Sequence, residues 1–362
     1  MSDIESTRKE IDKIDKLMAE LFEKRMDEVK KVAEYKIKNA LPILDESREE
    51  KVIKKNCRLI KNKNYTGFYT QFLKNTMKIS KAYQRNLCKG LRIAFSGVEG
   101  AFAQIAANKI FKNAETLGYA DFSSAYKAVE NGECDCAVLP LENSYNGDVG
   151  AVMDLAFSGS LSVTGIYDIL IVQNLLGIKG ASLESVTKVI SHPQALGQCA
   201  AFIKKHNLQV IEAENTALAA QKVLKLNKPD IAAIASEEAA EKYGLIKIES
   251  HINSAEGNTT RFSVFSRSAA QTENKNNFIM CFTVKNEAGA LGKAVSVIGS
   301  FGFNLRSLKS RPSKDSVWSY YFFAEGEGNI NTPNGKEMID ELKKHCNSVK
   351  IIGVYNKEIT LK

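Results

Sequence analysis

The sequence predicts a multidomain protein with an all-α helical segment, an α/β segment of two lobes, and a small α+β module of ferredoxin-like topology. Three patterns predict this: helical spacing of apolar residues near the N-terminus, repeated strand, polar corner and helix units in the middle, and a βαββαβ order at the end. With 362 residues, the chain exceeds one ordinary domain. The expected boundaries are 1–89, 91–267 with a second lobe at about 168–249, and 278–362.

Composition indicates a cytoplasmic globular protein. Hydrophobic residues make up 44% and charged residues 25% of the chain, which is an ordinary balance. No apolar run approaches the roughly 18–20 residues of a membrane span, and the acidic residues 1–5 contain no apolar leader. The seven cysteines are scattered, and Cys134 and Cys136 without a second pair make a poor zinc site. We therefore expect free thiols in a reducing compartment and no metal.

The positive charge is confined to the first quarter of the chain. Residues 1–90 contain 22 Lys/Arg and 14 Asp/Glu, a balance of +8, whereas residues 91–362 contain 28 of each and balance to zero. A basic segment suggests nucleic acid, a membrane surface or a small anionic substrate. Acidic residues are mixed in throughout, without the clustered cations and aromatics that nucleic acid favours, so a small anion remains open.

Residues 4–37 predict one long helix, since they contain no glycine or proline and their apolar residues recur every three or four positions. Such a helix is roughly 50 Å long. It cannot bury its apolar stripe alone, so we expect it to pack in a bundle with a second chain, giving a homodimer or a larger even-numbered assembly. A second helix is expected from about residue 45 to 62, and a third from about 66 to 86.

Basic and polar residues on these helices form possible anion sites. Arg25 and Lys36, 11 residues apart, point within roughly 20° of each other, whereas Arg8 lies about 25 Å from Arg25 and is turned by roughly 100°. Arg8 could therefore reach the site of an antiparallel partner chain. Helical spacing also places these residues on shared faces of the second and third helices: Asp45, Arg48 and Glu49, and Ser80 and Gln84. Solvated surface charge is the plain alternative.

The combined pattern resembles the all-helical chorismate mutase family over nearly all of residues 4–86. The family rearranges chorismate to prephenate, a reaction that needs the dianion held folded and charge on the ether oxygen stabilised. The resemblance implies that Arg8 of a partner chain, Arg25 and Arg48 hold carboxylates, and that Lys36 and Gln84 face the ether oxygen. Asp45, Glu49 and Ser80 would bind or orient the ring hydroxyl, the backbone and neighbouring charges.

The middle segment places polar corners beside apolar strands, where ligands usually bind in α/β layers. The corners are 142–147, 191–194, 214–216 and 257–262, and repeated βα units predict mainly parallel sheets with the corners on one side. Each corner could also be a simple turn. His192 precedes a proline, and its expected role is to orient the backbone of its turn.

Residues 91–267 resemble prephenate dehydratase. The resemblance rests on four motifs in this order: Glu-Asn-Ser-x-x-Gly, Ser-His-Pro-Gln, Glu-Asn-Thr and Asn-Thr-Thr-Arg-Phe. That family folds like periplasmic binding proteins and removes a ring hydroxyl and CO₂ to give phenylpyruvate. The resemblance implies that Thr260 aids departure of the hydroxyl as a hydrogen-bond donor. The remaining binding candidates are Glu142, Asn143, Ser144, Ser191, Gln198, Glu214, Thr216, Thr259 and Arg261. Arg261 could bind substrate or tie the lobes together, and Gln173 stands where a histidine is common.

The C-terminal segment resembles the ACT regulatory domain. Gly289, Ala290, Leu291, Ser310, Arg311 and Pro312 match the two segments that bind phenylalanine in that family. Lys309 stands where a glutamate is usual, and Gly292 where an apolar residue is usual. A module that only dimerises the chain is the alternative.

The three resemblances occur in the order found in bifunctional chorismate mutase–prephenate dehydratases. The chain is thus expected to bind chorismate and prephenate, to respond to phenylalanine, and to need no cofactor, because neither reaction needs an external electron sink. Three alternatives remain: a dehydratase whose helical segment only dimerises, a non-catalytic amino-acid sensor, and a DNA-binding role of the basic helices.

Overall fold

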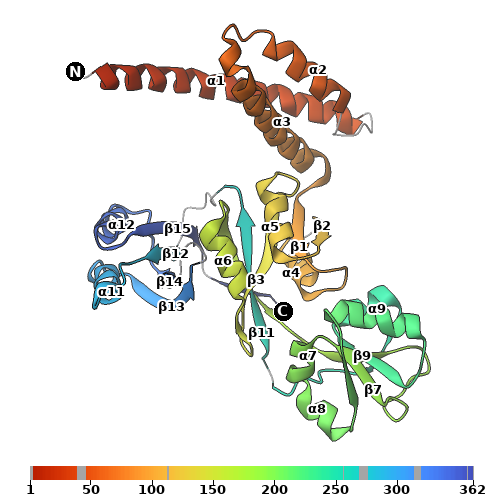
Figure 1. Ribbon diagram of the computed structural model, residues 1–362. Coiled ribbons are helices and arrows are strands. Elements are labelled where there is room, and N and C mark those ends of the chain that lie inside the picture. Colours follow the sequence, from red (N-terminus) through yellow and green to blue (C-terminus); the bar gives the residue numbers. More distant parts are fainter. Residues whose placement is uncertain are drawn as a thin grey trace. The chain divides into compact units, whose positions relative to one another are not determined.

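The computed structural model describes residues 3–38, 46–111, 114–255, 257–268, 276–313, 319–356 and 358–361. The chain forms two compact units (Figure 1). The first comprises Met1–Arg92 and Asn113–Glu115, and the second comprises Ile93–Lys112 and Thr116–Lys362. Within the described ranges, no helix has the length and apolar content that a membrane span requires.

The first unit is helical, as predicted. It contains α1 (Asp3–Lys38), α2 (Glu46–Cys57), a 3₁₀ turn (Lys63–Tyr65) and α3 (Thr66–Lys89). Helix α3 packs against both α1 and α2. The apolar stripe of α1 is largely exposed, including Ile11, Ile14, Leu17, Leu21 and Phe22.

The second helix ends at Cys57, five residues before the predicted end. The amides of Leu59 and Ile60 donate to the carbonyls of Asn56 and Cys57, which closes tight turns in place of a further helical turn. Asn62 then accepts a hydrogen bond from the Asn64 amide at 3.0 Å and caps the 3₁₀ turn. The prediction therefore extended the helix too far, because short-range capping competes with helix propensity here.

The first lobe of the second unit contains a sheet in the order β5-β11-β3-β1-β2. The short strand β4 pairs with the last residues of β3. Its strands are β1 (Arg92–Ser96), β2 (Glu115–Tyr119), β3 (Cys136–Asn143), β4 (Gly147–Asp148), β5 (Ser162–Leu170) and β11 (Thr259–Ser266). Its helices are α4 (Phe102–Ile110), α5 (Phe122–Glu130) and α6 (Gly150–Ser158).

The second lobe has a five-stranded sheet in the order β10-β6-β9-β7-β8. The strands are β6 (Asn174–Gly177), β7 (Lys188–Ser191), β8 (Gln209–Glu212), β9 (Ile231–Ala235) and β10 (Ile246–Glu249). The helices are α7 (Pro193–Gln198), α8 (Ala200–Lys205), α9 (Thr216–Leu226) and α10 (Glu237–Tyr243). Strand β9 is buried at every residue, which explains its run of Ile and Ala.

Both sheets are mixed, so the prediction of mainly parallel sheets was wrong. Strand β11 runs antiparallel to β3 and β5, because it returns from the second lobe and enters the first sheet from the opposite end. In the second lobe, β7, β8 and β9 are parallel, whereas β6 is antiparallel to its neighbours.

Two chain segments cross between the lobes and are hydrogen-bonded to each other. The amide of Ile171 donates to the Asn258 carbonyl at 2.7 Å, and the amide of Gln173 donates to the Asn253 carboxamide oxygen at 2.8 Å. The first of these segments begins where β5 ends, at Leu170.

The C-terminal module has the predicted βαββαβ order. It consists of β12 (Asn277–Thr283), α11 (Ala290–Ser300), β13 (Asn304–Pro312), β14 (Tyr320–Glu327), α12 (Pro333–His345) and β15 (Ser348–Tyr355). Both helices lie on one face of the antiparallel sheet (Figure 1). The core between the helices and the sheet includes Phe278, Phe282, Ile298, Met338 and Leu342.

The sheet of this module continues into the first lobe, which the sequence patterns did not predict. Strand β15 pairs in parallel with β5 at Gly353 and Val163, so that one eleven-stranded sheet results. A Cβ atom on Gly353 would lie 2.1 Å from the Val163 carbonyl oxygen, and only glycine allows this approach. The last strand, β16 (Ile359–Leu361), also pairs with β5.

Candidate active sites

Helices α1 and α3 bring together three of the candidate residues in the helical unit. The Arg25 guanidinium donates to the Ser80 hydroxyl, and Ser80 donates to the Thr76 carbonyl at 2.8 Å. Gln84, one turn further along α3, is buried, and its carboxamide oxygen has no hydrogen-bond partner among the described residues. Burial lowers the pKa of Arg25 from its usual value. A half-buried cation on α1 bonded to α3, and a buried amide oxygen without a partner one turn along α3, indicate a place for a polar ligand.

Among the other helical candidates, only Arg8 has a described side chain. Arg8 is exposed near the start of α1. Asp45 lies outside the described residues. Lys36, Arg48 and Glu49 lie within α1 and α2, but their side chains are also outside the described part of the structure. Their roles therefore remain predictions.

Asn143 and Thr260 form the centre of the dehydratase candidates. They are paired residues on β3 and β11. The Asn143 amide nitrogen donates to the Thr260 hydroxyl at 2.9 Å and to the Asn258 carboxamide oxygen at 3.0 Å. Because Thr260 accepts this bond through its oxygen, its hydroxyl hydrogen is available to donate elsewhere. Both side chains are buried.

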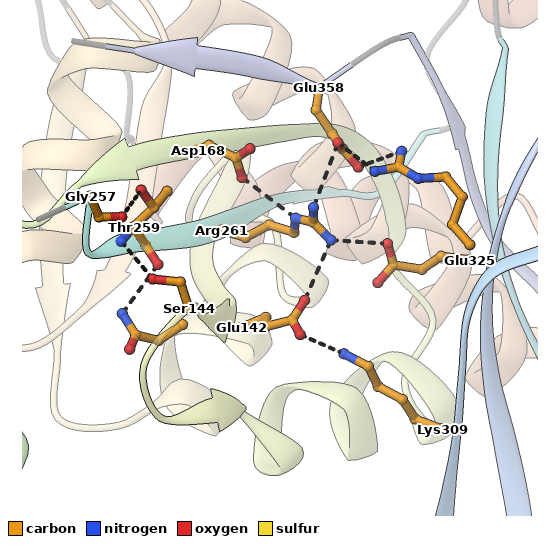
Figure 2. A network of polar contacts seen from close by, with 11 residues as sticks. Glu142, Ser144, Asp168, Gly257, Thr259, Arg261, Lys309, Glu325 and Glu358 are labelled. Carbon is orange, nitrogen blue, oxygen red and sulfur yellow. Dashed lines mark hydrogen bonds and ion pairs between the residues drawn. The ribbon is translucent and has the colours of Figure 1, made fainter. Parts of the chain in front are cut away.

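The backbone around this pair is fixed by further hydrogen bonds. The Asn143 carboxamide oxygen accepts from the amides of Tyr145 and Asn146, each at 3.0 Å. The Ser144 hydroxyl accepts from the Thr259 amide at 2.9 Å, and the Thr259 hydroxyl donates to the Gly257 carbonyl at 2.9 Å (Figure 2). These bonds hold the corner after β3 against the start of β11.

Two functional candidates were missed. Asn258 is buried, and its amide nitrogen has no hydrogen-bond partner among the described residues. Gln173 is also buried. It donates to the Gln198 carboxamide oxygen at 3.2 Å, while its own oxygen is without a partner in the described ranges. The sequence signal for Asn258 is its place in the Asn-Thr-Thr-Arg-Phe motif. The sequence signal for Gln173 is only that it stands where a histidine is common.

The remaining second-lobe candidates have unequal surroundings. Ser191 is fully buried and donates to the Ile234 carbonyl at 2.6 Å, so it fastens β7 to β9. Glu214 is exposed, and Thr216 is the half-buried first residue of α9. His192 accepts from the Gln194 amide at 3.2 Å and caps α7, which confirms its expected role in the turn. Burial lowers the pKa of His192.

Arg261 faces away from Thr260. Successive side chains of a strand point to opposite faces of the sheet. The Arg261 guanidinium lies among four carboxylates, at 3.4 Å from Glu142, 3.5 Å from Asp168, 3.4 Å from Glu325 and 3.6 Å from Glu358 (Figure 2). Two of these belong to the first lobe and two to the C-terminal part of the chain. The geometry therefore favours an architectural role for Arg261.

The effector candidates lie at one end of the C-terminal module. Gly289 precedes α11 with a left-handed φ of 83°, and Ala290 and Leu291 begin that helix. Ser310, Arg311 and Pro312 end β13. Ser310 lines a cavity of ≈ 650 Å³, together with residues at the end of β12 and the start of β15.

Comparison with known proteins identifies two families in this chain. Residues 7–85 match chorismate mutase type II, and residues 93–270 match prephenate dehydratase. The fold and sites thus define an enzyme that joins these two activities.

One relative has the same organisation over its whole length. The bifunctional chorismate mutase/prephenate dehydratase of Aquifex aeolicus is 32% identical over 362 residues, covering 99% of this chain and 99% of the relative. The chain belongs to the family of bifunctional chorismate mutase/prephenate dehydratases, enzymes of phenylalanine biosynthesis.

Solved structures match the part of the chain that follows the helical unit. GqqA, a novel type of quorum-quenching acylase, is 30% identical, with a TM-score of 0.68 over 73% of this chain and 97% of that chain. Prephenate dehydratase from Arthrobacter aurescens, in complex with L-Phe, is 24% identical, with a TM-score of 0.68 over 74% of this chain and 90% of that chain. The second likeness concerns the fold alone.

Replacing Arg261 with methionine tests its architectural role. The Glu325 side chain is only 2% exposed, so we expect the free energy of unfolding to fall by about 3 kcal/mol when its guanidinium partner is lost. Burial raises the pKa of Glu325, and Arg261 opposes that rise. Without Arg261, Glu325 stays protonated in the folded protein at pH values where it ionises in the unfolded chain. The loss of unfolding free energy caused by the substitution should therefore grow between pH 4.5 and pH 7.

Urea unfolding of the full chain at both pH values measures this deficit. Lys343→Met is the matched control, because Lys343 forms an exposed ion pair with Asp340, and its loss should cost under about 0.5 kcal/mol. Equal losses in the two variants would contradict the role assigned to Arg261.

Proposed function

We propose that the two activities use separate sites and that Thr260 and Asn143 form the reactive centre of the dehydratase. The observation that carries this proposal is the bond from Asn143 to the Thr260 oxygen, which leaves the threonine hydrogen as a donor. In the reaction, the electron pair of the bond to the departing CO₂ enters the ring. The ring hydroxyl leaves as water after it takes up one proton. A hydrogen bond from Thr260 to that hydroxyl stabilises its departure.

The other dehydratase candidates are assigned to binding and orientation. The residues that we propose to contact prephenate are Ser144, Thr259, Gln198, Glu214 and Thr216. Ser191 supports this group through the backbone of β9. Glu142 and Arg261 lie on the opposite face of the sheet from Thr260, so we assign them an orienting role through strands β3 and β11.

In the mutase, we propose that Arg25 and Gln84 bind the substrate, with Ser80 orienting the Arg25 guanidinium. Arg25 would hold a carboxylate, and Gln84 would face the ether oxygen. For Lys36, Asp45, Arg48 and Glu49 the proposed roles rest on their match to the family. This site works by electrostatic stabilisation and by holding a reactive conformation, with no covalent step.

We also propose a cytoplasmic enzyme that assembles as a homodimer or a larger even-numbered oligomer and is inhibited by L-phenylalanine. The domain limits 1–89, 91–267 and 278–362 are proposed with it. The exposed apolar stripe of α1 supports association, and the distance along α1 from Arg8 to Arg25 supports a site completed by a partner chain. The cavity beside Ser310 supports an effector site.

Reciprocal inactivation tests the two sites in the full chain. Thr260→Val keeps the shape of the side chain but removes the hydroxyl, so we expect dehydratase kcat to fall at least about 100-fold, with mutase activity unchanged. Arg25→Met should abolish mutase activity and leave the dehydratase intact. Separate assays with chorismate and prephenate measure both. Full mutase activity in Arg25→Met, or full dehydratase activity in Thr260→Val, would refute the assignment of that site.

Charge on the exposed stripe tests the dimer. Placing glutamates at Leu17 and Leu21 would bury charges between two α1 helices, so the variant should sediment as a monomer and lose mutase activity. Leu226→Glu, on an exposed position of α9, should change neither property. An unchanged assembly in the Leu17/Leu21 variant would exclude this face as the interface.

Titration with L-phenylalanine tests the effector. We expect dehydratase activity to fall as phenylalanine is added. Gly289→Val forces a branched side chain into a left-handed backbone and should raise the half-inhibiting concentration about tenfold. Gly299→Ala is the control, since a Cβ there meets no atom within 4 Å. Activity that does not respond to phenylalanine in the unmodified enzyme would reject the proposed regulation.

A further inference from the structure

Lys309 connects the effector strand to the dehydratase candidates. Its ammonium donates to Glu142 at 3.0 Å (Figure 2) and also to Asp148. These two residues pair with each other, so Lys309 binds both strands of the short hairpin formed by β3 and β4. Glu142 is the residue before Asn143. The Lys309 side chain is only 19% exposed, so water screens these ion pairs less than it would at the surface.

Strands β13 and β15 both contact helix α6, which follows this hairpin. Arg311 donates to both carboxylate oxygens of Asp154, at 2.9 and 3.2 Å. Its guanidinium lies so close to Gly150 that a Cβ atom there would clash with it. Lys350 donates to the last carbonyls of α6, at 2.8 Å to Ala156. These contacts hold the middle and the C-terminal end of the helix.

Strand geometry explains why two cations of β13 reach the first lobe. Lys309 and Arg311 are two residues apart and lie on the same, half-buried face of β13, whereas Ser310 lies on the exposed face. Ser310 and its neighbours are the proposed effector residues. Any movement of this strand therefore displaces the cations that bind Glu142, Asp148 and Asp154.

We propose that Lys309 is a positioning residue for the dehydratase reaction. By neutralising Glu142 and Asp148 together, it holds the end of β3 so that Asn143 stays opposite Thr260. It also makes the dehydratase site dependent on the position of the effector strand. This inference rests on the proposed roles of Asn143 and Thr260.

Steady-state kinetics of Lys309→Met in the full enzyme test the proposal. We expect dehydratase kcat to fall about tenfold, the effect of losing one charged hydrogen bond, with KM for prephenate changed less than twofold. Mutase activity in the same preparation should not change. Lys309→Arg should retain most of the dehydratase activity, and Lys343→Met, the same substitution at an exposed ion pair, should retain all of it.

Charge exchange adds an independent measurement. Lys309→Glu places a third carboxylate beside Glu142 and Asp148 and should lower dehydratase kcat further than Lys309→Met does. Adding Asp148→Lys should recover part of that loss, since it restores a cation beside Glu142.

Three outcomes would overturn the inference: dehydratase kcat within twofold of the unmodified enzyme in Lys309→Met, no recovery in the exchanged pair, or a parallel fall of both activities. An active Lys309→Met together with an inactive Thr260→Val would reject this inference and keep the proposed active site. An active Thr260→Val would instead reject the active site itself.

Discussion

Strand β11 lies between β3 and β5, and its register with these neighbours determines both faces of the dehydratase lobe. Thr260 pairs with Asn143, and Arg261 pairs with Glu142 and Asp168. Because side chains alternate along a strand, this register places the hydroxyl on one face and the guanidinium on the other. A slip by one residue would exchange the two faces. The buried side chains of Phe262, Val264 and Phe265 oppose such a slip, since it would move each of them to the opposite face and disrupt its packing.

The carboxylates around Arg261 explain how the C-terminal module is joined to this lobe. Glu325 comes from β14 and Glu358 precedes β16, while Glu142 and Asp168 come from β3 and β5. Removing one partner from such a cluster is costly, because it leaves a buried charge without compensation. The ion pairs are therefore better understood as fixing one arrangement of the module and the lobe than as a source of net stability. The backbone pairing of β15 and β16 with β5 supplies the continuous contact.

Much of this architecture could be predicted from local patterns in the sequence. The long helix without glycine or proline, the βαββαβ order and the polar corners after strands all depend on nearby residues. The direction of β11 could not be predicted, because it depends on where the chain re-enters the first sheet. The role of Arg261 was left open for a similar reason. All four of its carboxylates are more than 60 residues away in sequence, and two of them come from a module that the motif does not mention. Gln173 and Asn258 were missed because a buried amide without a partner can be recognised only once its neighbours are known.

The two active sites differ in how much of each a single chain provides. Asn143 is hydrogen-bonded to both Asn258 and Thr260 within one chain, so the proposed reactive centre of the dehydratase is built from residues of a single chain. In the helical unit, one chain brings together Arg25, Ser80 and Gln84, while Arg8 remains exposed near the far end of the same helix. A substrate with two carboxylates needs more than one cation, since each desolvated carboxylate needs its own partner. In the proposed dimer, the apolar stripe of α1 that joins the two chains also brings Arg8 of one chain to the site of the other. Association would then be part of building the mutase site, whereas the dehydratase depends on contacts within its own chain.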